Sequence, residues 1–463
     1  MTKRDTLTAL AFAVASALIR IPFRSTKLFH GDSYGLAMGA LFTWTAHPPG
    51  FIGFCALVRF VNYLAGDVTT SFIIVSIGTT AIATALVFIL GRTMFGFAEG
   101  VIAALFYATS LDVSYFSEVA LTYAAEGCFA TAAGLTSWLA ISRHSERWLV
   151  VHSIVLGVGG SVRQTTLAFL FPLWLYTMWK ATPRWRARVL GALALVIVVF
   201  GWSIPNARNL RRYWDKRDDV SYLRSVYDLQ VRMEQYYDSS KFGAVTYEES
   251  VRRFHWPLAE LAVGAWNAID PPSANAPPEV KRASAIGALR MIRYQTLKLI
   301  AYTLLACGLW IVFVIAGLRR LGRERAIFLA LWIVPAFLFF ALNHFGAWGY
   351  LLIFLGALAV IAAHGSPRGF AIVAIICAIH FGVFVFMRPL PDRSERATLM
   401  NIAVLQYGAP AIRMSYARAR SSAFSEDPRE LPVDCVTEEC LERNIPLDYN
   451  LPPGTKPMRT LFR

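Results

Sequence analysis

The sequence predicts an all-α polytopic membrane protein, on the grounds of composition, mean hydropathy and the length of its apolar runs. Of the 463 residues, 56% are hydrophobic and 16% are charged, whereas about a quarter of the residues in soluble domains are charged. The mean hydropathy of the chain is +0.47. Apolar runs of about 17–25 residues, the length that crosses a bilayer as a helix, recur along the sequence.

The formal net charge of +15 has a simple explanation in a membrane protein. Cytoplasmic loops are rich in Lys and Arg, and anionic lipid headgroups are the nearest acidic partner. The sequence contains no nucleic-acid-binding motif, zinc-finger spacing or Walker loop. We therefore expect contact with membrane lipids and none with nucleic acid.

Hydropathy predicts about eleven transmembrane helices, over 7–23, 70–91, 97–113, 118–141, 148–162, 165–180, 189–205, 296–318, 326–343, 348–364 and 369–387. One further apolar segment, 50–66, decides the topology. If it does not cross, the basic residues of the short loops all fall on one side; if it crosses, this positive-inside bias inverts. Although 50–66 is strongly apolar, we therefore predict a cytoplasmic N-terminus and interfacial helices over 33–66.

This topology divides the chain into four parts. An N-terminal transmembrane module covers 1–205, where any chemistry is expected, and an extracytoplasmic loop region with helical patterns covers 206–295. Transmembrane helices follow over 296–387, and the polar, Pro-rich segment 388–463 is an extracytoplasmic tail. Because the predicted cytoplasmic loops are short and almost purely basic, chemistry is expected on the extracytoplasmic side.

Asp32 is the first candidate for a chemical role. It follows His30-Gly31 just beyond the first span, where a carboxylate suits a general base or a ligand that orients a substrate hydroxyl. The alternative is an N-cap for a helix starting near Ser33, since Asp is a preferred capping residue. We favour the chemical role because other polar residues accompany it on the same predicted side.

Six further residues are candidates for substrate binding. His47 precedes Pro48-Pro49-Gly50 at a helix break. A structural role at this break is the first interpretation, and a role as metal ligand or acid is the alternative. Asp112 and Glu118 flank a short outer loop; they suit a metal or an acceptor, or simply a helix start. Arg163 lies between two short spans, as either a phosphate clamp or a topological anchor. Weaker candidates of the same kind are Arg208 and His344.

In their order these motifs resemble those of GT-C fold glycosyltransferases. This family of multispanning enzymes uses polyprenyl-phosphate-linked sugars and includes protein O-mannosyltransferases and lipid A aminoarabinose transferases. The resemblance covers about residues 1–390 and is carried by Gly31-Asp32-Ser33, His47-Pro48-Pro49, Ser117-Glu118, Gly159-Gly160-Ser161-Val162-Arg163, Arg208-Asn209, His344-Phe345-Gly346 and Gly349-Tyr350. Many members have Asp-Glu where this chain has Asp32-Ser33. The resemblance therefore implies no certain cofactor and leaves a divalent metal open.

The resemblance implies an inverting, single-displacement transfer of a hexosyl or pentosyl group. The donor would be a polyprenyl-phosphate sugar, the acceptor a lipid, polysaccharide or protein, and the location the bacterial inner (plasma) membrane. Asp32 would act as general base on the acceptor hydroxyl, and Arg163 with a basic residue of the long loop would stabilise the leaving phosphate.

Two alternatives stay open at the level of sequence. A polytopic lipid or solute transporter or flippase would also have many apolar helices, but transporters place charged or helix-breaking residues near mid-membrane. Here the breaks cluster at the predicted outer interface, which favours surface chemistry. A noncatalytic assembly protein with the same fold is the other alternative, and the presence of Asp32 argues against it.

Overall fold

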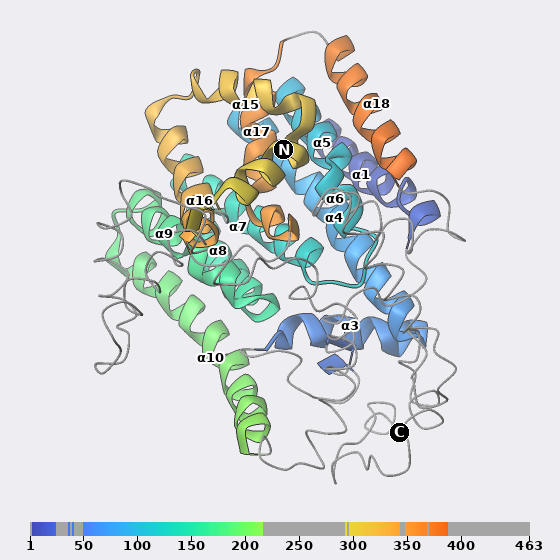
Figure 1. Ribbon diagram of the computed structural model, residues 1–463. Coiled ribbons are helices and arrows are strands. Elements are labelled where there is room, and N and C mark those ends of the chain that lie inside the picture. Colours follow the sequence, from blue (N-terminus) through green and yellow to red (C-terminus); the bar gives the residue numbers. More distant parts are fainter. Residues whose placement is uncertain are drawn as a thin grey trace, which may run out of the picture.

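The structure is a computed structural model that describes residues 2–24, 36–37, 39–40, 50–215, 292–293, 296–342, 348–367 and 370–387. Within these residues the regular elements are helices and no β-strand occurs, which confirms the all-α prediction (Figure 1). The first half comprises α1 (Lys3–Leu18), η1 (Ile21–Phe23), α3 (Ile52–Ala65), α4 (Val68–Met94), α5 (Phe97–Thr109), α6 (Leu111–Phe116), α7 (Tyr123–Ser142), α8 (Glu146–Val162), α9 (Gln164–Ala181) and α10 (Trp185–Asp215). The second half comprises helix 296–307, η2 (Gly308–Trp310), α15 (Ile311–Leu318), α16 (Arg323–Leu342), η3 (Trp348–Leu351), α17 (Leu352–Gly365) and α18 (Phe370–Met387).

Five helical segments in the described part of the chain are long and apolar enough to cross a membrane: Lys3–Phe23, Val68–Met94, Trp185–Asn209, Thr296–Leu318 and Arg323–Leu342. Four shorter apolar helices accompany them: Ile52–Ala65, Phe97–Thr109, Gly349–Gly365 and Phe370–Val385. The structure thus has the helical, apolar character that was predicted, while the count of eleven spans stays a prediction.

The buried centre of the bundle is built around α7 and α17. Helix α17 packs against α5, α7 and α15, and its residues 352–363 are all buried. The outer helices show the opposite pattern: on α10, Leu190, Leu193 and Ile197 are 50–68% exposed. Large exposed apolar surfaces mark contact with a membrane or a partner, so this arrangement suits a bundle surrounded by lipid.

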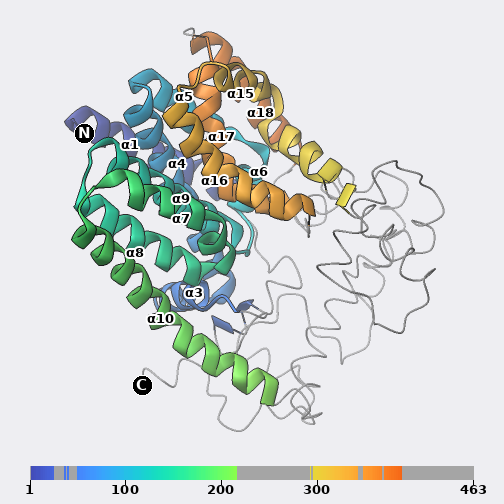
Figure 2. The ribbon, with the colours of Figure 1, turned by 90° about the vertical axis from the view of Figure 1, so that its left-hand side faces the viewer.

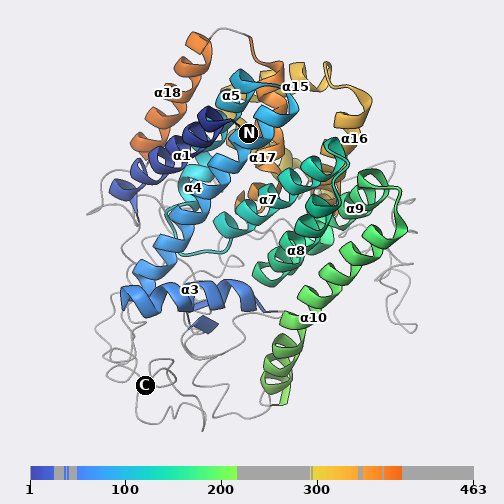
Figure 3. The same ribbon diagram turned by 180° about the vertical axis from the view of Figure 1, so that it is seen from behind.

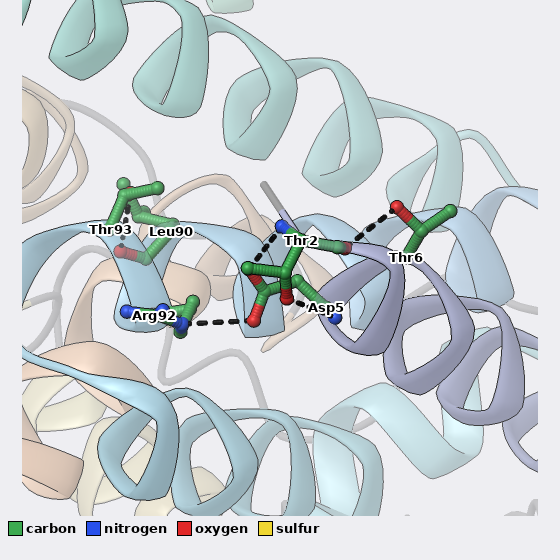
Figure 4. Close-up of polar contacts among 6 residues, drawn as sticks. All are labelled: Thr2, Asp5, Thr6, Leu90, Arg92 and Thr93. Atoms are coloured by element: carbon green, nitrogen blue, oxygen red, sulfur yellow. Dashed lines mark hydrogen bonds and ion pairs between the residues drawn. The ribbon is translucent and has the colours of Figure 1, made fainter.

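A capping box begins α1, and its Asp5 also pairs with Arg92 at the end of α4 (Figure 4). The Thr2 amide donates to Asp5 Oδ2 at 2.8 Å, and the Asp5 amide donates to Thr2 Oγ1 at 3.2 Å. Together these bonds satisfy two of the amides that a helix start leaves without an intrahelical acceptor. Arg92 Nε, in the last turn of α4, donates to Asp5 Oδ1 at 3.0 Å. Residues 87 positions apart therefore hold the two helices in register.

Helix α3 corresponds to the apolar segment predicted over 50–66, and it lies across the ends of α4 and α8 rather than alongside them (Figures 1 and 3). It ends at Gly66, whose φ of 75° is left-handed and whose amide donates to Asn62 O at 2.8 Å. Gly53 faces Ser161 of α8 so closely that a Cβ atom would overlap the serine hydroxyl. The position of α3 relative to a bilayer stays a prediction.

Several helix boundaries differ from those expected from hydropathy; for example, α5 ends at Thr109 and α7 begins at Tyr123, where spans over 97–113 and 118–141 were predicted. Helix α10 continues through Pro205 to Asp215 and extends beyond α8 (Figure 2), so the boundary at 205/206 falls within one helix. The segment 296–318 is interrupted at Gly308, which has a φ of 51°. There the Leu309 amide donates to His380 Nε2 of α18 at 3.1 Å, so a side chain 71 residues away replaces the regular helical acceptor.

Helices α15 and α17 approach each other through Gly317 and Gly365. A Cβ atom at Gly365 would overlap Phe313 O and the Gly317 amide nitrogen, both of which are backbone atoms. We expect Gly365→Ala to lower the midpoint of thermal unfolding, because overpacking of this kind costs about 1–3 kcal/mol. The control is Gly201→Ala on α10, where a Cβ atom has nothing within 4 Å; because Ala is a better helix former than Gly, its midpoint should stay equal or rise. Equal melting of the two variants would contradict the prediction.

Candidate active site

Arg163 lies at the junction of two helices, as predicted. Helix α8 ends at Val162 and α9 begins at Gln164, and Arg163 between them is extended, with φ −155° and ψ 124°. Its amide donates to Gly159 O at 2.9 Å, and its carbonyl accepts from the Thr166 amide at 3.0 Å. The backbone is therefore fixed on both sides, which directs the side chain into the bundle instead of leaving it on a loose loop.

The Arg163 guanidinium is paired with a carboxylate that was not among the predicted site residues. Arg163 Nη1 donates to Glu126 Oε2 at 3.1 Å, and their side chains are only 11% and 2% exposed. Thr165 Oγ1 donates to the other carboxylate oxygen, Oε1, at 2.7 Å. Charges in such a place are retained only when paired and hydrogen-bonded, and here both oxygens of the acid have a donor.

Three aromatic rings surround the same guanidinium. Arg163 Cζ lies 4.5 Å from the centre of the Tyr350 ring, 4.9 Å from that of Tyr123 and 5.9 Å from that of Phe51. The Tyr123 and Tyr350 rings meet edge to face at 5.4 Å. Distances below about 6 Å favour a cation over a ring face. We call Phe51, Tyr123, Glu126, Arg163, Thr165 and Tyr350 the Arg163 cluster.

The cluster is also where the predicted first loop meets the bundle. Gln164 Nε2, next to Arg163, donates to Gly50 O at 2.5 Å. Gly50 has a φ of 94°, and a Cβ atom there would overlap the Asn206 amide group of α10. The last residue of the His47-Pro48-Pro49-Gly50 break is thus tied beside Arg163, while His47 itself lies outside the described residues.

A second polar group forms around Arg20, which is 1% exposed. Its Nε donates to Ser117 Oγ at 2.7 Å, Nη1 to Ser16 O at 2.7 Å and Nη2 to Ala108 O at 2.7 Å. An arginine near the end of an apolar run can extend its charged group toward the membrane surface, but Arg20 instead points into the protein. Acceptors 88 and 97 residues away in sequence satisfy its donors inside the protein, so it fixes the end of α1 to α5 and to the α6–α7 connection.

Two of the predicted site residues, Asp112 and Glu118, are buried in this part of the chain. Glu118 is 0% exposed and directly follows Ser117, whose hydroxyl accepts from Arg20 Nε. Asp112, in α6, is also 0% exposed, and its carboxylate oxygens have no hydrogen-bond partner within the described residues. Substrate contact at these two acids stays a prediction.

The remaining predicted site residues are less closely defined. Asp32, like His344, lies outside the described residues. Arg208 lies on α10, in the part that follows Pro205, and is exposed. The structure therefore brings Arg163 together with Tyr350 of the predicted Gly349-Tyr350 motif, and Arg20 together with Ser117 of the predicted Ser117-Glu118 motif.

The Arg20 group yields a stability prediction. Ser117→Ala removes the acceptor of a buried guanidinium N–H, and losing a hydrogen bond to a charged group costs about 1.5–3 kcal/mol. We expect a clear fall in the midpoint of thermal unfolding in detergent. Ser142→Ala, at the exposed end of α7, is the matched control and should melt like the unchanged protein. A Ser117→Ala midpoint within error of that control would show that Arg20 does not depend on this bond.

No group of three or more His, Cys, Asp or Glu side chains in the described ranges could hold a metal ion. Glu126 is instead paired with the Arg163 guanidinium.

Comparisons with known proteins agree with the fold. The model of the family described as dolichyl-phosphate-mannose-protein mannosyltransferase matches residues 46–206, a range that contains Phe51, Glu126, Arg163 and Thr165. A search of curated proteins found no match.

Among solved structures, the chain is similar to ArnT from Cupriavidus metallidurans bound to undecaprenyl phosphate. The TM-score is 0.50 at 12% identity, over 90% of this chain and 76% of ArnT. A second similar structure is the oligosaccharyltransferase AglB from Archaeoglobus fulgidus, with a TM-score of 0.40 at 12% identity over 90% of this chain and 56% of AglB. The predicted resemblance to the GT-C fold is confirmed by the family model and the ArnT structure.

Proposed function

We propose that this chain is a membrane glycosyltransferase that moves a sugar from a polyprenyl-phosphate-linked donor to an acceptor hydroxyl. The GT-C fold and the match of residues 46–206 to a mannosyltransferase family support this proposal. The observation that carries it is the Arg163 cluster, a buried guanidinium held by Glu126 and surrounded by three aromatic rings. We assign the multi-pass chain to the bacterial inner membrane, with its N-terminus in the cytoplasm.

A lipid-linked phosphate is the ligand that we assign to Arg163. The similar ArnT structure holds undecaprenyl phosphate. A planar guanidinium offers several N–H donors to phosphate oxygens, and the hydrogen bond to Glu126 uses Nη1. Because a site of low dielectric strengthens electrostatic interactions, a cation already fixed in position is well suited to a developing phosphate charge.

The reaction that follows is an inverting single displacement. Asp32 accepts the proton of the acceptor hydroxyl as its oxygen bonds to the anomeric carbon. The bond between that carbon and the phosphate oxygen breaks at the same time, and its electron pair leaves with the polyprenyl phosphate. Arg163 stabilises the charge that the leaving phosphate gains. The proton ends on Asp32, so atoms and charge balance.

The other candidate residues are assigned to substrate binding. His47 lies three residues before Gly50, whose carbonyl accepts from Gln164 next to Arg163. His344 lies six residues before Tyr350, and the Tyr350 ring faces the Arg163 guanidinium. Both histidines are therefore assigned to the sugar or the acceptor. Arg208 is assigned to the donor phosphate on the exposed side of α10, and Asp112 and Glu118 to the acceptor.

The test is product analysis with purified full-length protein in detergent. The protein is incubated with a panel of polyprenyl-phosphate sugars and a membrane fraction as acceptor, and polyprenyl phosphate and the modified acceptor are measured by mass spectrometry. We expect release of polyprenyl phosphate together with a mass increase of one sugar on an acceptor. If reconstituted protein instead moves the intact sugar lipid across vesicles and releases no polyprenyl phosphate, the chain is a transporter and the proposal is wrong.

A further inference from the structure

The turn between α15 and α16 concentrates positive charge at one end of the bundle. Four of the seven residues 319–325 are arginines and one is a glutamate. This turn follows Thr296–Leu318 and precedes Arg323–Leu342, two segments long and apolar enough to span a membrane. The charge therefore lies where two apolar helices would leave the bilayer.

Two of the four arginines are held by the protein. Arg320 Nη1 donates to Gly365 O at 3.5 Å. Arg325 Cζ lies 4.8 Å from the centre of the Phe95 ring, which in turn stacks on His364 at 4.0 Å. These contacts hold the turn against the ends of α4 and α17, so the position of its backbone is fixed.

The other two arginines, Arg319 and Arg323, are exposed. Neither side chain makes a hydrogen bond or ion pair with the described part of the chain. Between them lies Gly322, where a Cβ atom would have nothing within 4 Å. The turn is thus open at Gly322, and both exposed guanidinium groups have donors available for a ligand.

Exposed apolar side chains lie on α15 before Arg319 and on α16 after Arg323. On α15, Val312, Ile315 and Leu318 are 51–55% exposed directly before Arg319. On α16, Ile327, Val334 and Leu338 are 37–50% exposed, and their spacing from Arg323 puts them on the face that Arg323 begins. A ligand that suits this surface needs an anionic head and long apolar chains.

We infer that Arg319 and Arg323 bind the headgroup phosphate of an anionic phospholipid, whose acyl chains lie along the exposed faces of α15 and α16. A soluble anion or a nucleic acid would match the charge but would leave the adjoining apolar faces uncovered. A lipid of the surrounding leaflet covers both, and juxtamembrane basic clusters attract anionic lipids. This site is separate from the Arg163 cluster and does not depend on the proposed enzymatic activity.

The test is lipid binding to the purified full-length chain in neutral detergent, followed by native mass spectrometry. The probes are phosphatidylglycerol and phosphatidylcholine with identical acyl chains. We expect the Kd for phosphatidylglycerol to rise about tenfold or more in Arg319→Gln/Arg323→Gln, because each basic residue near an anionic headgroup contributes roughly fivefold. Binding of phosphatidylcholine should be weak and unchanged.

The matched control is Arg143→Gln/Arg147→Gln, which removes two exposed arginines from the α7–α8 turn. Helix α7 is buried along nearly all of its length, so the apolar face that precedes Arg319 is missing before Arg143. The control should bind phosphatidylglycerol within about twofold of the unchanged chain, a factor that corresponds to less than half a kcal/mol. Equal loss of phosphatidylglycerol binding in both double variants would show that net charge alone explains the effect, and would overturn the inference. Unchanged binding in Arg319→Gln/Arg323→Gln, or displacement of the lipid by millimolar inorganic phosphate, would overturn the inference.

Discussion

Arg163→Gln is expected to lower the rate of polyprenyl phosphate release by roughly 10²–10³-fold, the usual cost of removing one fixed donor from a developing anion. The guanidinium is buried and held by Glu126 at 3.1 Å, so water cannot readily take its place. The loss should lie in kcat as well as in kcat/KM, because the charge on the phosphate grows in the transition state. Rates would be measured by mass spectrometry of released polyprenyl phosphate.

This variant needs a control for folding, since it leaves the Glu126 carboxylate buried without its cation. Removing one partner of a buried pair is strongly destabilising, by about 3–5 kcal/mol. The double variant Arg163→Gln/Glu126→Gln removes both charges and should regain most of the melting temperature without regaining activity. If activity returns together with stability, the arginine acts only on the fold.

Arg163→Lys separates charge from geometry. Lysine keeps a cation beside Glu126 but loses the planar fork, which binds phosphate oxygens in pairs. We expect near-normal melting and activity between that of the unchanged chain and that of Arg163→Gln. Arg143→Gln, at the exposed α7–α8 turn, is the charge-matched control and should retain full activity.

Hydropathy was sufficient to predict the helical character of the chain but could not locate its interruptions. The break at Gly308 depends on His380, whose ring nitrogen accepts from the Leu309 amide. No residue within 296–318 indicates that a hydrogen-bond acceptor 71 residues away lies next to this helix. The same limit applies to Arg20, whose position near the end of a span suggests a membrane surface until its acceptors Ser117 and Ala108 are known.

Arg163 could be selected from sequence because an arginine between two short apolar runs has few purposes. Glu126 was missed, although it also stood out as the only acidic residue within 119–141. A carboxylate in an apolar helix is costly and needs a partner, so Glu126 itself indicates a cation nearby in the fold. Tyr123 and Thr165 had no such signal, since their roles depend on where Arg163 points.

Asp32→Asn is expected to lower sugar transfer by roughly 10²–10⁴-fold, the range that a positioned general base contributes. An amide is nearly the same size as a carboxylate but cannot accept the proton of the acceptor hydroxyl at neutral pH. Donor binding should be retained, because the phosphate is assigned to Arg163, so kcat should fall while the Kd for the polyprenyl-phosphate sugar stays within a few fold. The two quantities can be measured separately by single-turnover kinetics and by donor binding.

The alternative role of Asp32 as a helix cap gives the opposite result, because Asn and Asp are nearly equivalent caps. Asp67 provides the comparison within the same chain: its Oδ2 accepts from the Thr70 amide at 2.6 Å and begins α4. Asp67→Asn should therefore leave both melting and activity close to normal. If Asp32→Asn behaves in the same way, Asp32 is also a cap and the proton must be taken by another group. Loss of activity at Asp32 alone, with equal melting of both variants, separates proton transfer from capping.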